Sequence, residues 1–267
     1  MKIACLQLDI AWEDQEKNYS KTEELIKKTC SSSSGKPDFI CLPELFSTGV
    51  TLDSKKFEET IDGKTCLFLS RVAKENKIYL LGGFIEKKEK ENKDDLPFNS
   101  AVVYNPKGEL IAKYNKNHVF TLGDEHKAYS NGSGISVFKL KDFDTSLFIC
   151  YDLRFPEIFR IATSKGANLL IVHANWPNPR KDHWKTLLKA RAIENQAYVI
   201  GINRVGESPG LTFFGGSMVV SPKGEIVKEL SDKESVLECE IDFNELKEFR
   251  ESFPALKDRR EKYYKEL

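Results

Sequence analysis

The sequence carries no net charge, because 41 Lys and Arg residues are matched by 41 Asp and Glu residues. Without a basic field a protein does not attract nucleic acid or acidic lipid by bulk electrostatics, so we expect a small-molecule partner. No segment approaches the roughly 20 apolar residues of a membrane span. The N-terminal stretch MKIACLQLDIAW holds Asp9 within its apolar run, which predicts a first strand rather than a signal peptide. These absences favour a cytoplasmic protein with neither a membrane nor a nucleic acid as partner.

Metal-binding and disulfide signals are also missing. The six cysteines form no Cys-x-x-Cys pair, and there are only four histidines, so a structural zinc site has no framework. A chain of 267 residues buries a large core and does not need disulfides to hold it together. We expect reduced thiols and no metal.

Apolar runs typical of buried strands alternate with amphipathic stretches typical of helices. The expected strands are 3–8, 38–42, 78–84, 146–149, 167–176 and 197–203, and the expected helices are 18–29, 66–76, 159–165 and 183–195. This alternation predicts an α/β fold whose sheets are covered by helices. A linker is expected at 31–37, and the charged run from Glu86 to Asp95 predicts a solvated loop.

Two segments of the chain are near copies of each other. VVYNPKGELI (102–111) and MVVSPKGEIV (218–227) each predict a strand, a Pro-Lys-Gly turn and a returning strand. Each follows a predicted helix and a buried strand, which indicates internal pseudo-duplication within one domain, 1–267, rather than a solenoid. Two related sheets would then pack face to face with helices outside. The charged segment 242–267 is expected to be a C-terminal arm that packs on a partner subunit.

Three polar residues stand where predicted strands end or turn: Glu44, Lys116 and Cys150. Ligands of α/β sheets gather at the carboxyl ends of strands, so these side chains could form one site. A thiolate attacks a carbonyl carbon, and a carboxylate takes the thiol proton and later activates water. The lysine is expected to lower the pKa of the thiol and, with the backbone N–H of Tyr151, to stabilise an oxyanion. Alternatively, the cysteine is a small buried hydrophobe, the glutamate a cap after Pro43 and the lysine a surface residue.

The text around these residues resembles the nitrilase superfamily of carbon–nitrogen hydrolases. LPELFSTG surrounds Glu44, KYNKNHVF surrounds Lys116 and CYDLRFPE surrounds Cys150, in the order that the family uses. Further matches are NWP at 175–177, HW at 183–184 and ARAIENQAYV at 190–199, and the similarity extends from IACLQLD to about Arg260. The resemblance implies a four-layer α-β-β-α sandwich, a homodimer or higher homo-oligomer, and no metal or organic cofactor.

The same resemblance implies roles for individual residues. Glu44 would be the general base, Lys116 the oxyanion-stabilising lysine and Cys150 the nucleophile. Glu125 stands in a Glu-x-Lys…Gly setting and would orient Lys116 or the substrate; the alternative is an ordinary loop carboxylate.

Within the family, CYDLRFPE and the segments 173–184 and 190–206 look like the omega-amidase branch. This branch implies hydrolysis of the terminal amide of 2-oxoglutaramate or 2-oxosuccinamate. Other members of the family implied by the resemblance are N-carbamoyl amine hydrolases and nitrilases. A catalytically silent regulatory protein of the same fold and a Cys-His-Asp hydrolase are further alternatives.

A substrate with a distal carboxylate needs a cation, for which Arg154, Arg180 and Lys181 are candidates. Arg154 is expected to pair with Glu157 or another nearby carboxylate, so Arg180 is favoured. His173 is expected to be a satisfied core residue, whereas His118 and His183 would orient the site walls. The other expected residues of the substrate pocket are Phe120, Tyr151, Asn175 and Trp176.

Overall fold

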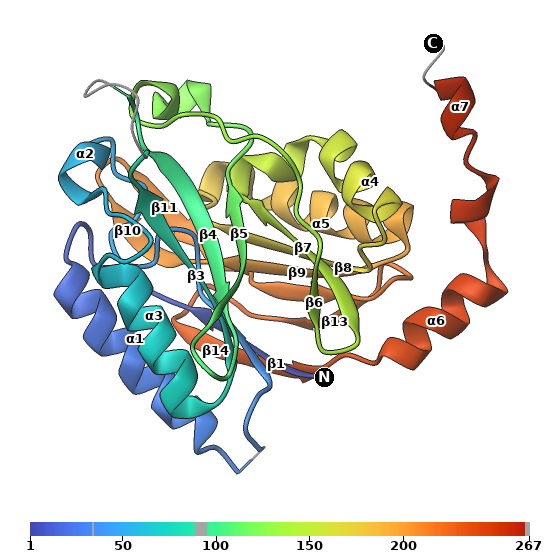
Figure 1. The fold of residues 1–267 in the computed structure, drawn as a ribbon, viewed down its shortest axis with the longest axis horizontal. Coiled ribbons are helices and arrows are strands. Elements are labelled where there is room, and N and C mark those ends of the chain that lie inside the picture. The colour runs from blue at the N-terminus through green and yellow to red at the C-terminus, as the bar shows by residue number, and fades with distance from the viewer. Residues whose placement is uncertain (34, 89–94, 265–267) are drawn as a thin grey trace.

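The computed structural model describes residues 1–33, 35–88 and 95–264, and most of its strands form two six-stranded sheets (Figure 1). The first sheet has the order β14 (Ser235–Glu240), β1 (Lys2–Gln7), β2 (Phe39–Cys41), β3 (Tyr79–Glu86), β4 (Phe98–Tyr104) and β5 (Leu110–Asn115). The second has the order β13 (Ile226–Glu229), β12 (Met218–Val220), β9 (Tyr198–Asn203), β8 (Leu169–Ala174), β7 (Phe143–Ile149) and β6 (Phe138–Leu140).

The alternation of side chains along each strand creates four layers. On β1, Cys5 enters a core shared by both sheets, whereas Leu6 packs with α1 (Gln15–Cys30) and α3 (Lys64–Asn76). On β8, Ile171 enters the shared core, whereas Val172 packs with α4 (Pro156–Ser164) and α5 (Lys181–Asn195). Because central strands such as β2, β8 and β9 are buried on both faces, their sequences are continuous apolar runs. The predicted α-β-β-α sandwich is confirmed.

The predicted internal duplication is also confirmed. In each sheet three parallel strands are followed by an antiparallel hairpin: β1, β2, β3 with β4–β5, and β7, β8, β9 with β12–β13. Both hairpins shift register at the same place, between Val103 and Tyr104 and between Val219 and Val220. β2 and β8 therefore occupy equivalent positions, and so do the loops that follow them.

Some parts of the chain differ from expectation. The two-stranded ribbon β10 (Val205–Ser208) and β11 (Leu211–Phe214) was not predicted, nor was the short helix α2 (Ser54–Phe57). The loop expected to begin at Glu86 begins later, because Glu86 is the last residue of β3 and is buried. Its carboxylate accepts a hydrogen bond from Ser100 and pairs with Lys113, which makes its burial tolerable. Most of the expected loop lies outside the described residues.

The C-terminal segment divides into two parts. Helix α6 (Phe243–Ser252) packs on its own chain, where Leu246 is buried and Arg250 donates to the carbonyl of Gln196 at 2.8 Å. Beyond it, a 3-10 turn (Ala255–Asp258) and α7 (Glu261–Tyr264) run away from the body of the molecule (Figure 1). The projecting part is thus shorter than the expected 242–267.

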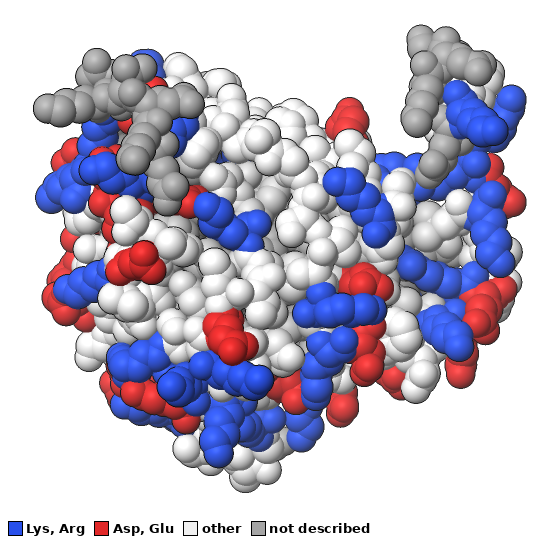
Figure 2. Space-filling model, in the orientation of Figure 1, with Lys and Arg blue, Asp and Glu red and all other residues white. Residues whose placement is uncertain are grey.

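Charged residues of both signs are mixed around the face shown in Figure 2, and uncharged residues fill much of its centre. This mixture fits the zero net charge and gives that face no field of a single sign. Among the described residues, no helix is long and apolar enough to cross a membrane.

A buried arginine connects two segments of the chain through hydrogen bonds to their backbone carbonyls. Arg204, which follows β9, is fully buried and donates to the carbonyls of Ile10 at 2.9 Å, Val205 at 3.0 Å and Glu207 at 3.0 Å. Burial lowers its pKa to about 10, opposed by Asp9. One side chain therefore ties the loop after β1 to the ribbon β10–β11.

We expect Arg204→Met to destabilise the fold by about 3 kcal/mol or more, because three carbonyls lose their donor inside the protein. Urea unfolding at neutral pH measures this change. The matched control is Arg71→Met on α3, whose half-exposed pairs with Glu23 and Glu75 contribute about 1 kcal/mol or less. Equal losses in the two variants would contradict the structural role of Arg204.

Candidate active site

Cys150 lies directly after β7, where it begins a 3-10 turn (Cys150–Arg154). Its φ is +46°, a left-handed conformation that is uncommon for a residue with a side chain. The turn is held by the buried carboxylate of Asp152, which accepts hydrogen bonds from the Ile149 N–H at 3.0 Å, the His118 N–H at 3.0 Å and the Tyr114 hydroxyl at 2.7 Å. The His118 ring also bonds it, at 2.8 Å. The strand end and this carboxylate together fix the backbone that carries the thiol.

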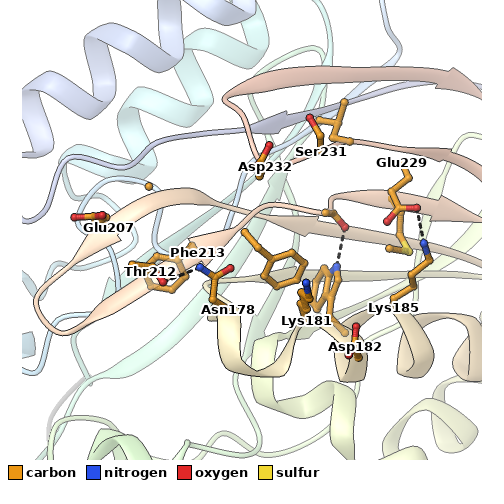
Figure 3. Close-up of a pocket in the computed structure, with 16 residues that line it drawn as sticks. Asn178, Lys181, Asp182, Lys185, Glu207, Thr212, Phe213, Glu229, Ser231 and Asp232 are labelled. Atoms are coloured by element: carbon orange, nitrogen blue, oxygen red, sulfur yellow. Dashed lines mark hydrogen bonds and ion pairs between the residues drawn. The ribbon is translucent and has the colours of Figure 1, made fainter.

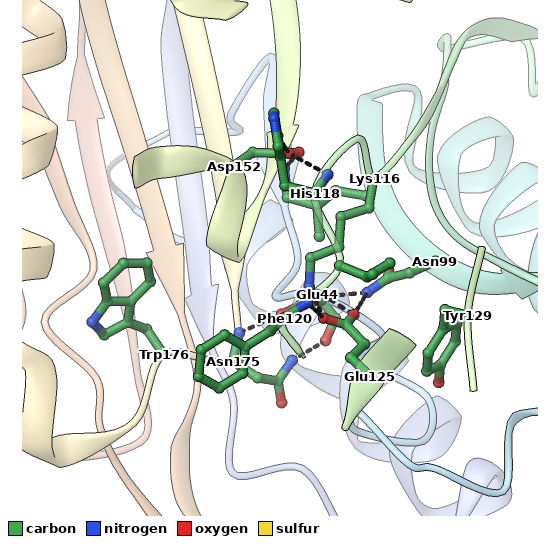
Figure 4. A network of polar contacts seen from close by, with 12 residues as sticks. Glu44, Asn99, Lys116, His118, Phe120, Glu125, Tyr129, Asp152, Asn175 and Trp176 are labelled. Carbon is green, nitrogen blue, oxygen red and sulfur yellow. Dashed lines mark hydrogen bonds and ion pairs between the residues drawn. The ribbon is translucent and has the colours of Figure 1, made fainter. Parts of the chain in front are cut away.

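Lys116 lies just past β5 and joins two carboxylates (Figure 4). Its Nζ is 3.0 Å from Glu44 Oε1, 2.7 Å from Glu125 Oε1 and 2.9 Å from Glu125 Oε2. Glu44 is 0% exposed, and Lys116 and Glu125 are each 2% exposed. The structure thus brings together the predicted Glu44, Lys116 and Glu125 in one buried cluster.

Two asparagines complete the hydrogen bonding of Glu44. Asn99 Nδ2 donates to Glu44 Oε1 at 2.7 Å and reaches Glu125 Oε1 at 3.3 Å. The backbone N–H of Asn175 donates to Glu44 Oε2 at 2.7 Å, and its Nδ2 donates to the Glu44 carbonyl at 2.5 Å. Asn99 was missed in the sequence, although the polar pair Asn99-Ser100 near the start of an otherwise apolar strand was an available signal.

The electrostatics of the thiol differ from expectation. Burial, and then the nearby Glu44 carboxylate, raise the pKa of Cys150 well above its ordinary value, although Lys116 acts in the opposite direction. Burial would lower the pKa of Lys116, but Glu125 and Glu44 outweigh it, and the pKa is raised well above its ordinary value. Lys116 thus lowers the pKa of the thiol, as predicted, but its effect is outweighed. Burial comes first and the two carboxylates second, and together they keep the pKa of Cys150 above its ordinary value.

A pocket of about 580 Å³ opens above the cluster and is lined by Glu44, Lys116, Glu125 and Cys150. The six other predicted site residues also line it: Phe120, Tyr151, Arg154, Asn175, Trp176 and Arg180. The opposite wall comes from the loop after β1, residues 50–53 and the ribbon β10–β11.

A second cavity of about 710 Å³ lies between α5, the ribbon and β13 (Figure 3). It is lined by residues of mixed charge, such as Lys185 and Glu229, which pair at 2.8 Å, and by no cysteine or histidine. Lys181 lines this cavity rather than the pocket that holds Cys150. The structure therefore removes Lys181 from the candidate cations.

The two arginines of the Cys150 pocket have no carboxylate partner in the described part of the chain. The expected pairing of Arg154 with Glu157 is wrong, because α4 begins at Pro156 and places Glu157 on the surface. The Arg154 guanidinium carbon instead lies 4.8 Å from the Trp176 ring centroid, and its nitrogens lie 3.3 Å from His183 Nδ1. The guanidinium carbon of Arg180 lies 5.4 Å from the Phe120 ring centroid.

Histidine does not form a pair with Cys150. His118 is bound to Asp152 and stacks on Phe155 at 3.8 Å between centroids. His173 is buried on β8, and burial lowers its pKa to about 3. Hydrogen bonds to the backbone of Pro43 and Leu42 oppose this shift, so His173 lies in the core in contact with the loop before Glu44. Among the described residues, no group of three or more His, Cys, Asp and Glu residues is placed to hold a metal ion.

The sequence and the fold are similar to those of known proteins. A family model described as carbon-nitrogen hydrolase matches residues 2–251. A 2-oxoglutaramate amidase from Bacillus subtilis is 38% identical over 263 residues, which cover 98% of each chain. An omega-amidase from Xenopus laevis is 33% identical over 257 residues, 92% of this chain and 91% of its own.

Among solved structures, a carbon–nitrogen hydrolase superfamily protein from Xanthomonas campestris, with an arsenic adduct in its active site, superposes with a TM-score of 0.88. It is 29% identical and covers 97% of both chains. The predicted nitrilase-superfamily membership and the prediction of an enzyme are confirmed. The chain is a hydrolytic enzyme and belongs to the carbon–nitrogen hydrolase family.

Proposed function

We propose that this enzyme hydrolyses the terminal amide of a short 2-oxo dicarboxylic monoamide, 2-oxoglutaramate or 2-oxosuccinamate, and releases ammonia. The observation that carries the proposal is a buried Glu44–Lys116–Glu125 cluster in a pocket that also holds Cys150 and two arginines. No carboxylate among the described residues pairs with either arginine. The names of the Bacillus subtilis and Xenopus laevis relatives support the same substrate class.

The proposed chemistry begins from a neutral thiol. Glu44 takes the proton of Cys150 as the sulfur attacks the amide carbon, and Lys116 with the Tyr151 N–H stabilises the oxyanion. The C–N bond then breaks, and the proton held by Glu44 passes to the leaving nitrogen, which departs as ammonia. Glu44 next takes a proton from water, whose oxygen attacks the thioester and releases the acid and the thiol.

The neighbours of these groups have positioning roles in this scheme. Glu125 accepts two hydrogen bonds from Lys116 and one from the Phe120 N–H at 2.6 Å, so it fixes the ammonium that faces the oxyanion. The side-chain oxygen of Asn175 is buried and has no partner among the described residues. It offers an acceptor for the N–H groups of the amide, while Phe120 and Trp176 wall the pocket.

The distal carboxylate requires a cation, and we assign this role to Arg180, with Arg154 as a second contact. Both guanidinium groups rest against aromatic rings of the pocket. Arg180 keeps its hydrogen-bond donors available for a ligand carboxylate, whereas Arg154 also bonds His183. Lys181, the next residue along, faces the other cavity.

We propose a homodimer or higher homo-oligomer in the cytoplasm, where the six free cysteines stay reduced. The projecting C-terminal segment exposes Phe253, Tyr263 and Tyr264, which fit a contact with a partner subunit. Sedimentation of the purified chain tests this assembly.

The proposed reaction predicts ammonia release from 2-oxoglutaramate that is abolished in Cys150→Ala. The alanine variant should keep its fold, because only one sulfur atom is lost. Mass spectrometry of the wild type quenched during turnover should find the acyl group on the peptide that contains Cys150. An adduct on another peptide, or turnover by Cys150→Ala, would remove the assigned nucleophile.

Glu44→Gln should lower kcat by about 10²–10⁴-fold, because glutamine keeps the shape but cannot accept a proton. The same change removes an anion that raises the pKa of Cys150, so that pKa should fall and thiolate should form at lower pH. Ultraviolet thiolate absorbance across a pH titration, with Cys150→Ser as blank, measures the shift. Glu157→Gln, on the surface of α4, is the control; an unchanged thiol titration in Glu44→Gln would contradict the electrostatic account.

Arg180→Met should lower kcat/KM for 2-oxoglutaramate by roughly 30-fold or more, since an unpaired ligand carboxylate costs about 2 kcal/mol. Pentanamide, which has no carboxylate, should lose little. Lys181→Met provides the matched control, because it removes a neighbouring cation that faces the other cavity. Equal losses on the charged and neutral amides would mean that Arg180 only holds its loop.

A further inference from the structure

Three exposed leucines surround the mouth of the pocket that holds Cys150. Leu52 is 53% exposed, Leu122 is 77% exposed and Leu211 is 47% exposed, and all three line the pocket. They belong to separate segments: the loop before α2, the 3-10 turn Thr121–Gly123 and the strand β11. A single exposed leucine needs no explanation, but three that converge on one opening form an apolar rim.

The pocket is larger than the proposed substrate requires. Its volume of about 580 Å³ lies within the range of roughly 300–1,000 Å³ that drug-sized ligands occupy. A short dicarboxylic monoamide has only about ten non-hydrogen atoms, well below drug size. Once the amide is at Cys150 and the carboxylate at the arginines, the outer part of the pocket is left over.

The order of groups along the pocket indicates what that outer part accepts. The buried cluster forms the floor, and Arg180 rests on Phe120, which is two residues from Leu122. A substituent on the carbon that bears the ligand carboxylate would then point toward the mouth, which the leucines line. Val50 and Pro209 add further apolar surface beside them.

The remaining charged groups of the rim exclude an anionic substituent. Glu13 and Asp53 both line the pocket. The Glu13 carboxylate is fixed by the Thr51 hydroxyl at 2.5 Å and by Lys56 at 3.4 Å. Two carboxylates at this end would repel a second negative charge on the ligand. A neutral, apolar tail is not repelled by these carboxylates.

We propose that the leucine rim, Leu52, Leu122 and Leu211, is an outer subsite for an apolar tail, and that the enzyme also hydrolyses Nα-acylglutamines. This inference rests on the proposed amidase function. The chemistry is unchanged: the C–N bond of the terminal carboxamide breaks, water supplies the oxygen of the new carboxyl group, and ammonia leaves. The product is the Nα-acylglutamate.

A series of acetyl-, butanoyl-, hexanoyl- and octanoylglutamine tests the subsite. Binding to the inactive Cys150→Ala protein, measured by calorimetry, gives the affinity of each compound without any turnover. We expect affinity to rise about two- to fourfold for each added CH₂ until the tail fills the rim, four being the value for full burial. An affinity that does not change along the series would overturn the proposal.

Substitutions in the leucine rim test whether the acyl tail binds there. Leu122→Ser with Leu52→Ser, in the Cys150→Ala background, should reduce the ratio of octanoyl to acetyl affinity by about tenfold, because both leucines lose their contact with the chain. Leu67→Ser is the control: this leucine is 60% exposed on α3 and does not line the pocket. A ratio that survives the double substitution would place the tail elsewhere and also overturn the proposal.

Ammonia release by the active enzyme tests the amidase function separately from the outer subsite. Affinity that rises with tail length, together with hydrolysis of both 2-oxoglutaramate and the acylglutamines, is the result expected. Rising affinity without any hydrolysis would refute the amidase function and the acylglutamine activity but retain the subsite. Hydrolysis of 2-oxoglutaramate with an unchanged affinity series would retain the function and refute the subsite.

Discussion

The burial of Lys116 between Glu44 and Glu125 is the constraint on which the rest of the site depends. Three charged groups removed from water are tolerated only when their hydrogen bonds are satisfied inside the protein. Donors to the two carboxylates come from β4, from the loop before the 3-10 turn Thr121–Gly123 and from the residue after β8. Burial and the two carboxylates of this cluster raise the pKa of the adjacent thiol, so the proposed reaction starts from a neutral thiol.

The internal duplication explains how such donors meet. Glu44 follows β2 and Asn175 follows β8, which are equivalent strands of the two sheets, and these two loops bond directly to each other. The ends of another equivalent pair, β1 and β7, have diverged. The end of β7 carries Cys150, whereas the loop after β1 is fastened by Arg204 and supplies Trp12 to the pocket wall. One half of the duplication thus carries the proposed nucleophile, and the other half supplies part of the pocket wall.

Much of the fold was predictable because its signals are local. Continuous apolar runs identified the central strands, and the repeated Pro-Lys-Gly turns identified both hairpins and their relation. Glu44, Lys116 and Cys150 could be proposed from the sequence because each stands at a strand end in a specific motif. The ribbon β10–β11 was not predicted, since few of its residues are buried and they show no strong periodicity. Asn99, the burial of Glu86 and the surroundings of Arg154 depend on contacts between segments far apart in the chain. The sign of the thiol pKa shift required the balance of burial and three charges, which sequence spacing cannot supply.

The charges of the pocket, taken together, restrict where an anionic substrate can bind. The floor carries Glu44 and Glu125 against Lys116, and the mouth carries Glu13 and Asp53. Lys116 and Lys56 already pair with carboxylates at these two ends, so the arginines are the cations of the pocket that can bind a ligand carboxylate. In the proposed reaction the amide must also reach Cys150. The separation between Cys150 and the arginines then selects substrates by the number of atoms between their two functional groups. The apolar rim lies outside this selection and leaves the far side of the ligand free to vary.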